Sequence, residues 1–262
     1  MRTMRDAETH ADAGIVYRPA ASLAEGDLSM PRRKPRSAAI SLAFRLTRLL
    51  RAIGLERFAL RVLLKASWVC TRLAYEISSE RIGPVFETST RGVTEELLAR
   101  TIAPGSVVLD LGCGGGRLTR MAARLGGEIV AVDLSPANIE RARAYGIPPN
   151  VEYICGDARD VLLRRHFDVV LLVHVLEHIE NADAFLQLLR TQASKTIIEV
   201  PNFEADALNS VRVAMGAPFY TDADHMREYT PAILRGQLER NGWRVVEQEI
   251  RGASIVAVAS SL

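Results

Sequence analysis

The stretch VVLDLGCGGGRLTR, residues 107–120, decides the fold of this chain. It begins as an apolar run, passes through four glycines and continues with residues spaced as in a helix. Glycine at a strand-to-helix turn permits a positive φ and lets a ligand approach the backbone closely. Two common phosphate-binding motifs are excluded, because GxGxxG needs a glycine where Arg117 stands, and a P-loop needs Lys followed by Ser or Thr.

Short apolar runs alternate with helical segments on the C-terminal side of this stretch. The runs predicted as strands are 106–111, 128–134, 151–157, 167–173, 195–201, 243–250 and 253–260. Alternating strands and helices favour a parallel sheet with helices on both faces. The last two runs are separated only by a short turn at Arg251 and Gly252, which requires an antiparallel pair. We therefore expect an α/β fold with a doubly wound, Rossmann-like sheet of seven strands and an antiparallel last strand.

Acidic residues follow three of the predicted strands. Asp110 precedes the glycines, Asp133 ends the second strand, and Asp157 with Ala158 ends the third. Asp110 would repel a pyrophosphate but suits a cationic ligand group, and an acid after the second strand reads ribose hydroxyls. Asp157 can accept a hydrogen bond from an adenine amine. The pattern indicates an adenosine without phosphate that carries a positive charge, and S-adenosylmethionine fits this description.

Several spaced motifs resemble the class I S-adenosylmethionine-dependent methyltransferases. They are VLDLGCGGGRLT (108–119), VAVDLSPANIERAR (130–143), YICGDARD (153–160), FDVVLLVHVLEHIEN (167–181) and EVPN (199–202). The resemblance covers about residues 85–260. It implies that Asp110, Gly112 and Gly114 hold the methionine part of S-adenosylmethionine, with Asp133 on the ribose and Asp157 and Ala158 at the adenine. It also places Cys113, Leu134, Val173 and His174 in the cofactor pocket.

Three titratable residues follow the fourth strand, namely His174, Glu177 and His178. Their spacing puts them on one face of any helical turn that begins there. Open α/β sheets bind ligands at this edge, and histidine is a suitable base for removing a hydroxyl proton during methyl transfer. The first hypothesis is therefore an O-methyltransferase in which His178 or His174 is the general base and Glu177 orients it.

A second hypothesis assigns the cluster to a divalent metal. Glu177, His178 and the later His225 resemble the metal ligands of small-RNA 3′-terminal 2′-O-methyltransferases, although His174 stands where those enzymes have a first glutamate. A similar Glu-His pair occurs in ubiquinone-pathway O-methyltransferases. Mixed His and Glu ligands suit Mn, Fe, Co or Zn better than Mg. The third interpretation is structural: the turn follows a common family consensus, with its histidines hydrogen-bonded near the pocket. Of the three, we expect an active site without a metal.

The segment after the fifth strand stands where members of the family bind the methyl acceptor. Its polar and aromatic residues are candidates to contact that acceptor: Asn202, Phe219, Tyr220, His225, Arg227 and Tyr229. Core packing is the competing interpretation for the aromatic ones. Tyr75 and Phe86, before the first strand, are weaker candidates for a lid.

The N-terminal part of the chain differs in composition from the rest. Residues 1–37 are polar and predict a flexible tail, and residues 38–84 predict a basic helical extension before a methyltransferase domain at 85–262. Residues 31–73 hold eleven Lys or Arg and one acid, Glu56, so the remainder of the chain is net negative. Two interpretations of helix 38–73 stay open. It is either a solvated helical cap or an amphipathic helix that contacts a membrane surface or an acidic substrate.

The amino-acid composition limits the cellular compartments and the classes of methyl acceptor that fit this chain. The three cysteines form no zinc or disulfide pattern, and no apolar run reaches the ~18 residues needed to span a bilayer, so we expect a cytoplasmic protein. The catalytic part of the chain carries no net positive charge, which favours a small-molecule acceptor over nucleic acid. We therefore expect O-methylation of a sugar, a glycan precursor or a secondary metabolite. The alternatives are metal-assisted RNA 2′-O-methylation and a non-catalytic protein that binds S-adenosylmethionine.

Overall fold

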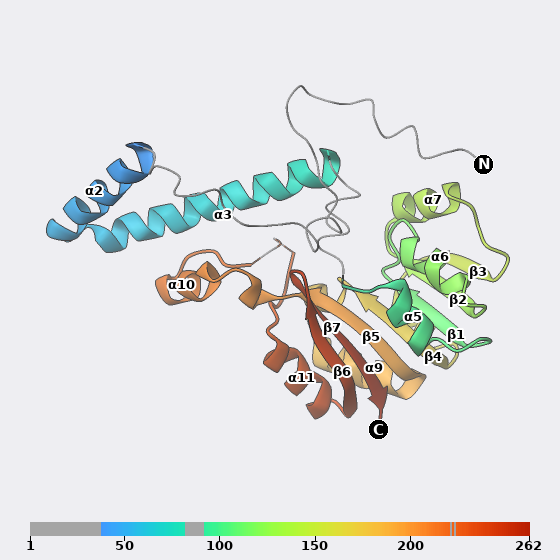
Figure 1. Cartoon of the computed structure of the whole chain (residues 1–262). Coiled ribbons are helices and arrows are strands. Elements are labelled where there is room, and N and C mark those ends of the chain that lie inside the picture. The colour runs from blue at the N-terminus through green and yellow to red at the C-terminus, as the bar shows by residue number, and fades with distance from the viewer. Residues whose placement is uncertain (1–37, 82–91, 221, 223) are drawn as a thin grey trace.

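The computed structural model describes residues 38–81, 92–220, 222 and 224–262, and its centre is a seven-stranded sheet (Figure 1). The strand order is β3-β2-β1-β4-β5-β7-β6. The first five strands are parallel, and β7 runs antiparallel to both of its neighbours, as the short turn after β6 predicts. The strands are β1 (Val107–Leu111), β2 (Glu128–Asp133), β3 (Val151–Cys155), β4 (Phe167–Val173), β5 (Ala193–Pro201), β6 (Trp243–Arg251) and β7 (Ser254–Ser261).

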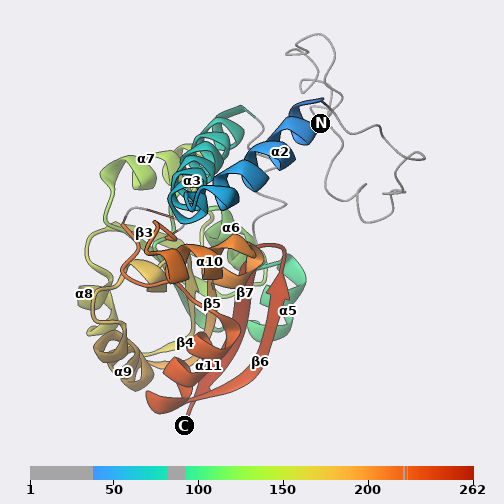
Figure 2. The same ribbon diagram turned by 90° about the vertical axis from the view of Figure 1, so that its left-hand side faces the viewer.

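Helices connect the strands and cover both faces of the sheet (Figures 1 and 2). Two of them begin with a side-chain cap followed by proline, Ser135 before α7 and Thr230 before α11, which fixes where each helix starts. The helices beside the sheet are α5 (Glu95–Thr101), α6 (Arg117–Ala123), α7 (Pro136–Ala144), α8 (Ala158–Leu162), α9 (Ala182–Gln192), α10 (Leu208–Met215) and α11 (Pro231–Arg240). Short 3₁₀ turns at η1 (Leu176–His178) and η2 (Phe203–Ala205) follow β4 and β5.

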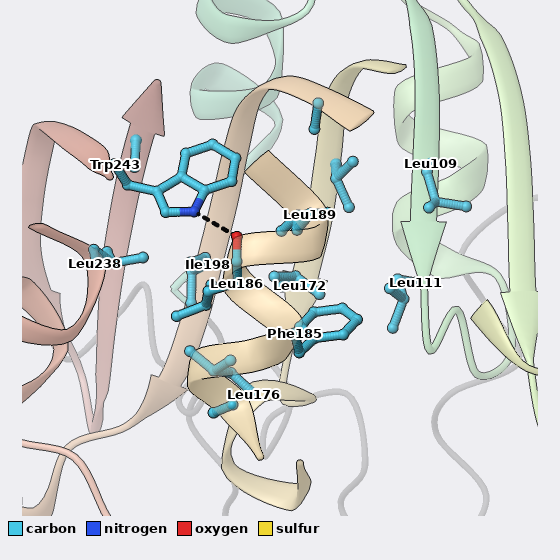
Figure 3. Packing of buried hydrophobic residues seen from close by; sticks show 14 of the residues in the cluster. Leu109, Leu111, Leu172, Leu176, Phe185, Leu186, Leu189, Ile198, Leu238 and Trp243 are labelled. Carbon is cyan, nitrogen blue, oxygen red and sulfur yellow. Dashed lines mark hydrogen bonds between the residues drawn. The ribbon is translucent and has the colours of Figure 1, made fainter. Parts of the chain in front are cut away.

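The core lies on both faces of the sheet, because the central strands are buried on both sides. In β4, Val170 and Leu172 pack in one hydrophobic cluster, and Val169 and Leu171 pack in the cluster on the opposite face. Figure 3 shows the first cluster, in which the indole N–H of Trp243 donates to the Leu186 carbonyl at 3.0 Å. A buried sheet of this kind holds its carboxyl edge rigidly, and that edge carries the site.

Two helices form the N-terminal extension. They are α2 (Ala38–Ala52) and α3 (Glu56–Arg81), and the break between them falls at Gly54, whose φ is +71°. Figures 1 and 2 show them over one end of the sheet, with α3 next to α10. The Arg61 guanidinium donates to the Met215 carbonyl at 3.2 Å. No helix in the described part of the chain is long and apolar enough to cross a membrane. The tail predicted at 1–37 and the lid candidate Phe86 lie outside the described residues.

Candidate active site

The glycine loop between β1 and α6 requires glycine for steric reasons. Gly112 and Gly116 have φ values of +71° and +74°. A Cβ atom on Gly112 would lie 2.7 Å from a methyl carbon of Val175, and one on Gly116 would lie 2.6 Å from the Tyr153 hydroxyl. Both distances are too short for any side chain to fit without displacing its neighbour. Glycine is therefore needed at both positions, and we call the resulting tight turn of backbone at the carboxyl end of β1 the cradle.

Asp133 organises this cradle from the end of β2. One carboxylate oxygen accepts a hydrogen bond from the Gly114 backbone N–H at 2.9 Å. The other accepts from the backbone N–H of Ser135 at 2.8 Å and from the Asn138 side chain at 3.0 Å. Leu134, the next predicted cofactor residue, is exposed beside it. Asp133 therefore joins the glycine loop to the start of α7.

The other two acids occupy different environments. Asp110 is only 2% exposed, and its carboxylate accepts from the Thr119 hydroxyl at 2.5 Å, so it lies beneath the loop. Burial raises the pKa of Asp110 to about 6, against the opposing effect of that hydrogen bond. Asp157 is more open: it caps α8 ahead of Ala158 and pairs with the Arg159 guanidinium, which lowers the pKa of Asp157.

All the predicted cofactor residues lie at the carboxyl ends of β1 to β4, which are neighbours in the sheet. Cys113 belongs to the glycine loop and is buried, and burial raises the pKa of its thiol. Val173 ends β4 and is half-buried, with His174 directly after it. The sheet thus brings together residues that are spread over more than 60 positions of the chain, from Asp110 to His174.

His174 is held between two buried carboxylates. Its Nδ1 lies 3.2 Å from Glu177 and its Nε2 lies 3.2 Å from Glu199. Burial alone would lower the pKa of His174, but the hydrogen bonds to Glu177 and Glu199 outweigh it and raise the pKa to about 9. His174 is therefore an imidazolium at neutral pH and cannot accept a proton. This argues against His174 as the general base, and the hydrogen bond of Glu177 is made to His174 rather than to His178.

Glu199 is a site residue whose contacts the sequence did not reveal. Besides holding His174, it accepts hydrogen bonds from the backbone N–H groups of Gly92 and Val93 at 2.7 and 2.8 Å. Burial would raise the pKa of Glu199, but the hydrogen bond and charge of His174 and these two N–H groups lower it. His174 also has a φ of +55°, which makes it the one non-glycine residue in the left-handed region within the described part of the chain. Backbone strain of this kind concentrates at functional sites.

His178 lies on the other side of the turn, facing His225. The two imidazole rings are 4.7 Å apart and meet edge to face. His178 Nδ1 lies 3.4 Å from the exposed carboxylate of Asp224, and His225 Nδ1 lies 3.0 Å from Glu228. Burial would lower the pKa of His225, but the Glu228 contact raises it. Potential ligand atoms of Glu177, His178 and His225 all lie within 4.8 Å of one another, which fits a divalent ion.

Next to these histidines lies a cavity of about 510 Å³. Its walls come from α3, the end of β4, the segment after β5, α10 and the β6–β7 turn. Four of the predicted acceptor residues line it: Asn202, Phe219, Tyr220 and His225. Two do not. Arg227 is exposed outside it, and Tyr229 is fully buried, where its hydroxyl donates to Gln237 at 2.9 Å. Tyr229 therefore supports the core and cannot contact an acceptor in this conformation.

Helix α3 supplies a wall that sequence reasoning missed. The Trp68 indole N–H donates to the Tyr220 carbonyl at 2.9 Å, and the rings of these two residues meet edge to face at 5.5 Å. The Arg72 guanidinium pairs with Asp222 at 3.0 Å. Arg212 of α10, only 3% exposed, also lines the cavity. In the sequence, only the tryptophan within a basic helix could have indicated that α3 lines the cavity. No feature of the sequence indicated that Arg212 does.

The strand order and the glycine loop resemble those of the class I S-adenosylmethionine-dependent methyltransferases, and a family model supports this resemblance. Residues 109–193 match the family model described as a methyltransferase domain. This match confirms the predicted resemblance, whereas the domain bounds at 38–84 and 85–262 stay predictions.

Among curated proteins, the chain is similar to ubiquinone biosynthesis O-methyltransferases. The mitochondrial one of Schizosaccharomyces pombe is 40% identical over 99 residues, which is 36% of this chain and 36% of that protein. That of Bradyrhizobium diazoefficiens is 30% identical over 43% of this chain and 46% of its own length. The matches thus span less than half of these relatives.

Solved structures show the same fold. The chain aligns with the DhpI–SAH complex with a TM-score of 0.55 and 22% identity, over 76% of this chain and 97% of that one. It aligns with an S-adenosylmethionine-dependent methyltransferase from Archaeoglobus fulgidus with a TM-score of 0.50 and 20% identity, over 67% and 98%. Because the sequence identities are this low, these alignments show only that the folds are similar.

Proposed function

We propose that this protein transfers a methyl group from S-adenosylmethionine to a hydroxyl oxygen of a quinone precursor. The observation that carries the proposal is the place of His178. It lies at the wall of the cavity, in the 3₁₀ turn η1 that follows the strand whose end belongs to the proposed cofactor edge. A group in this position can serve a hydroxyl that approaches the methyl donor in line.

The chain's own residues divide the work as follows. The bound cofactor supplies the electrophilic methyl carbon on its sulfonium. With the cofactor bound, His178 would take the proton of the acceptor hydroxyl as the methyl group passes to that oxygen and the sulfonium becomes a neutral sulfide. Asp224, 3.4 Å from His178, stabilises the imidazolium that forms. His174 holds a fixed positive charge and, through Glu199, anchors the chain at Gly92 and Val93.

Aromatic walls support a planar acceptor. Trp68, Phe219 and Tyr220 line the cavity, with ring centroids 5.5 Å apart for Trp68–Tyr220 and 6.2 Å apart for Phe219–Tyr220. Such walls favour a ring that can stack or meet them edge on. The names of the curated relatives support the same class, so a quinone precursor replaces the sugar or glycan precursor that the sequence suggested. The cytoplasmic location stays a prediction.

A transfer assay tests the proposal. Wild-type protein with labelled S-adenosylmethionine is offered ring hydroxyls of the quinone-precursor type, a sugar panel and an RNA 3′ end, with products identified by mass spectrometry. We expect label on the ring oxygen. The variant His178→Gln should lose transfer while binding S-adenosylhomocysteine as wild type does. Cofactor binding without transfer to any acceptor would favour the non-catalytic alternative, and label on RNA would favour the nucleic-acid one.

A metal-assisted version of the reaction is the second candidate. Besides the spacing of Glu177, His178 and His225, the Oε2 atom of Glu177 is buried and has no hydrogen-bond partner among the described residues. Glu177 and the two histidines would then hold the ion, which would supply a positive charge to the acceptor oxygen. The test is metal content by mass spectrometry after exposure to Mn²⁺ or Co²⁺, for wild type and for His225→Ala. Equal, negligible content and activity unaffected by chelator would remove this candidate.

A further inference from the structure

We propose that α2 and α3 dock this protein on an anionic lipid bilayer, which they contact through apolar faces turned away from the methyltransferase domain. This surface is separate from the proposed reaction and holds whether or not the acceptor is a quinone precursor.

Helix α3 has two faces with different tasks. The inner face holds the domain: Leu64 is buried, Trp68 bonds to the Tyr220 carbonyl, and Arg72 pairs with Asp222. The opposite face carries apolar residues three, four or seven positions apart, starting at the residue before the helix, which puts them on one stripe. They are Leu55, Phe58, Val62, Val69, Leu73 and Ile77, and all are exposed.

Helix α2 continues this pattern. Leu42, Leu46, Leu49 and Ile53 recur at helical spacing, and each is more than half exposed, from 51% to 66%. Apolar surface of this extent on two consecutive helices is unusual for a protein that meets only water, and such patches mark interaction sites. The described part of the chain leaves both stripes open.

The positive charges of α2 and α3 indicate which kind of surface these helices bind. Between residues 38 and 73 there are seven Lys or Arg and a single acid, Glu56. On α2, Arg45, Arg48 and Arg51 are exposed and alternate with the leucines along the chain, and on α3 Lys65 is exposed as well. A second copy of the chain would bring the same positive charge against this face. An anionic headgroup layer supplies the opposite charge and receives the apolar side chains, as it does for interfacial amphipathic helices.

Docking of this kind places the cavity wall next to the lipid. Trp68 and Tyr75 of α3 line the cavity from the inner side, so a single helix separates cavity and bilayer. No described helix can span a membrane, so α2 and α3 would lie in the plane of the surface. An acceptor with a lipid tail would then reach the cavity without leaving the interface.

Vesicle co-sedimentation of the full chain tests the proposal without any assay of methyl transfer. The probes are vesicles of phosphatidylcholine alone and of phosphatidylcholine mixed with phosphatidylglycerol. We expect binding to the anionic vesicles only, weakened by salt. The triple variant Arg45→Gln, Arg48→Gln, Arg51→Gln and the triple variant Leu42→Ser, Leu46→Ser, Leu49→Ser should each lose at least about tenfold in partitioning.

Matched controls make the changes on exposed residues of the domain. The variant Arg164→Gln, Arg235→Gln, Arg244→Gln removes the same charge, and Ile147→Ser, Leu163→Ser, Val246→Ser removes similar apolar surface. Both should bind vesicles as wild type does, with folding of every variant checked by circular dichroism. Failure of wild type to bind anionic vesicles, including the case where the helices pair in a dimer, would overturn the proposal. Equal binding to neutral vesicles, or equal losses in the control variants, would overturn it too.

Discussion

The proposed cofactor edge and the proposed acceptor cavity of this protein are built in different ways. The cofactor edge consists of short loops that each follow their own strand, with Gly112, Asp133 and Asp157 placed by local sequence. The acceptor cavity is assembled from segments far apart in the chain, such as Trp68 of α3 and Tyr220, which are 152 positions apart. Local sequence therefore specifies the first half of the site, and tertiary packing specifies the second.

The cofactor edge and the acceptor cavity meet at the end of β4. The variant His178→Gln tests whether His178 belongs to the acceptor side alone. We expect kcat to fall by about 10²–10⁴-fold, the range for loss of a general base. Affinity for S-adenosylhomocysteine, measured by calorimetry, should stay at the wild-type value because His178 lies on the acceptor side. A fall in both quantities would mean that the two halves are not separable at this residue.

Asp133→Ala should damage the cofactor half alone. The change removes acceptors for Gly114, Ser135 and Asn138. A hydrogen bond to a charged group contributes roughly 1.5–3 kcal/mol, so the loss of even one from the binding loop should lower affinity for S-adenosylhomocysteine at least about 10-fold in the same titration. The matched control is Glu140→Ala on the exposed side of α7, which should bind normally. Unchanged binding by Asp133→Ala would show that the loop keeps its shape without this acid.

The His174 cluster joins the halves and predicts a pH dependence of stability. The pKa of folded His174 is raised from 6.5 to about 9, so its contribution is fully present below pH 6.5 and is lost as pH rises through 9. Because over a third of this side chain is exposed, solvent reduces the contribution to about 1–2 kcal/mol. Thermal melts from pH 6 to 10 should show wild type losing stability relative to His174→Gln. If wild type and His174→Gln showed the same dependence of melting temperature on pH, the proposed charge on His174 would be wrong.

Tyr229→Phe should have the smallest effect of these variants. It should lower the free energy of unfolding and leave catalysis unchanged. The variant leaves Gln237 without the hydroxyl donor, which costs about 0.5–1.5 kcal/mol in denaturant unfolding. The acceptor KM should not change, whereas Phe219→Ala, in the cavity wall, should raise it. A raised KM for Tyr229→Phe would return this residue to the acceptor site.

What could be predicted from the sequence follows the same division. Alternating apolar runs predicted the strands, and the short turn at Arg251 and Gly252 predicted the antiparallel pair, because both signals are local. The Arg212 wall and the burial of Tyr229 depend on which segments pack together, and no nearby residue encodes that. Glu199 is an intermediate case, since its strand was recognised while its contact with His174 depends on the β4–β5 register.

The acceptor segment is fastened at both of its ends. Asn202 and Tyr229 form an isolated parallel bridge, and the Phe203 N–H donates to the Tyr229 carbonyl at 2.8 Å. The residues between them therefore form a closed loop that leaves and rejoins the sheet at one point. Loop-closure entropy changes slowly with length, so insertions and replacements within 204–228 cost the sheet little. Under the proposed function this loop would determine the acceptor preference, so it could be exchanged without rebuilding the sheet.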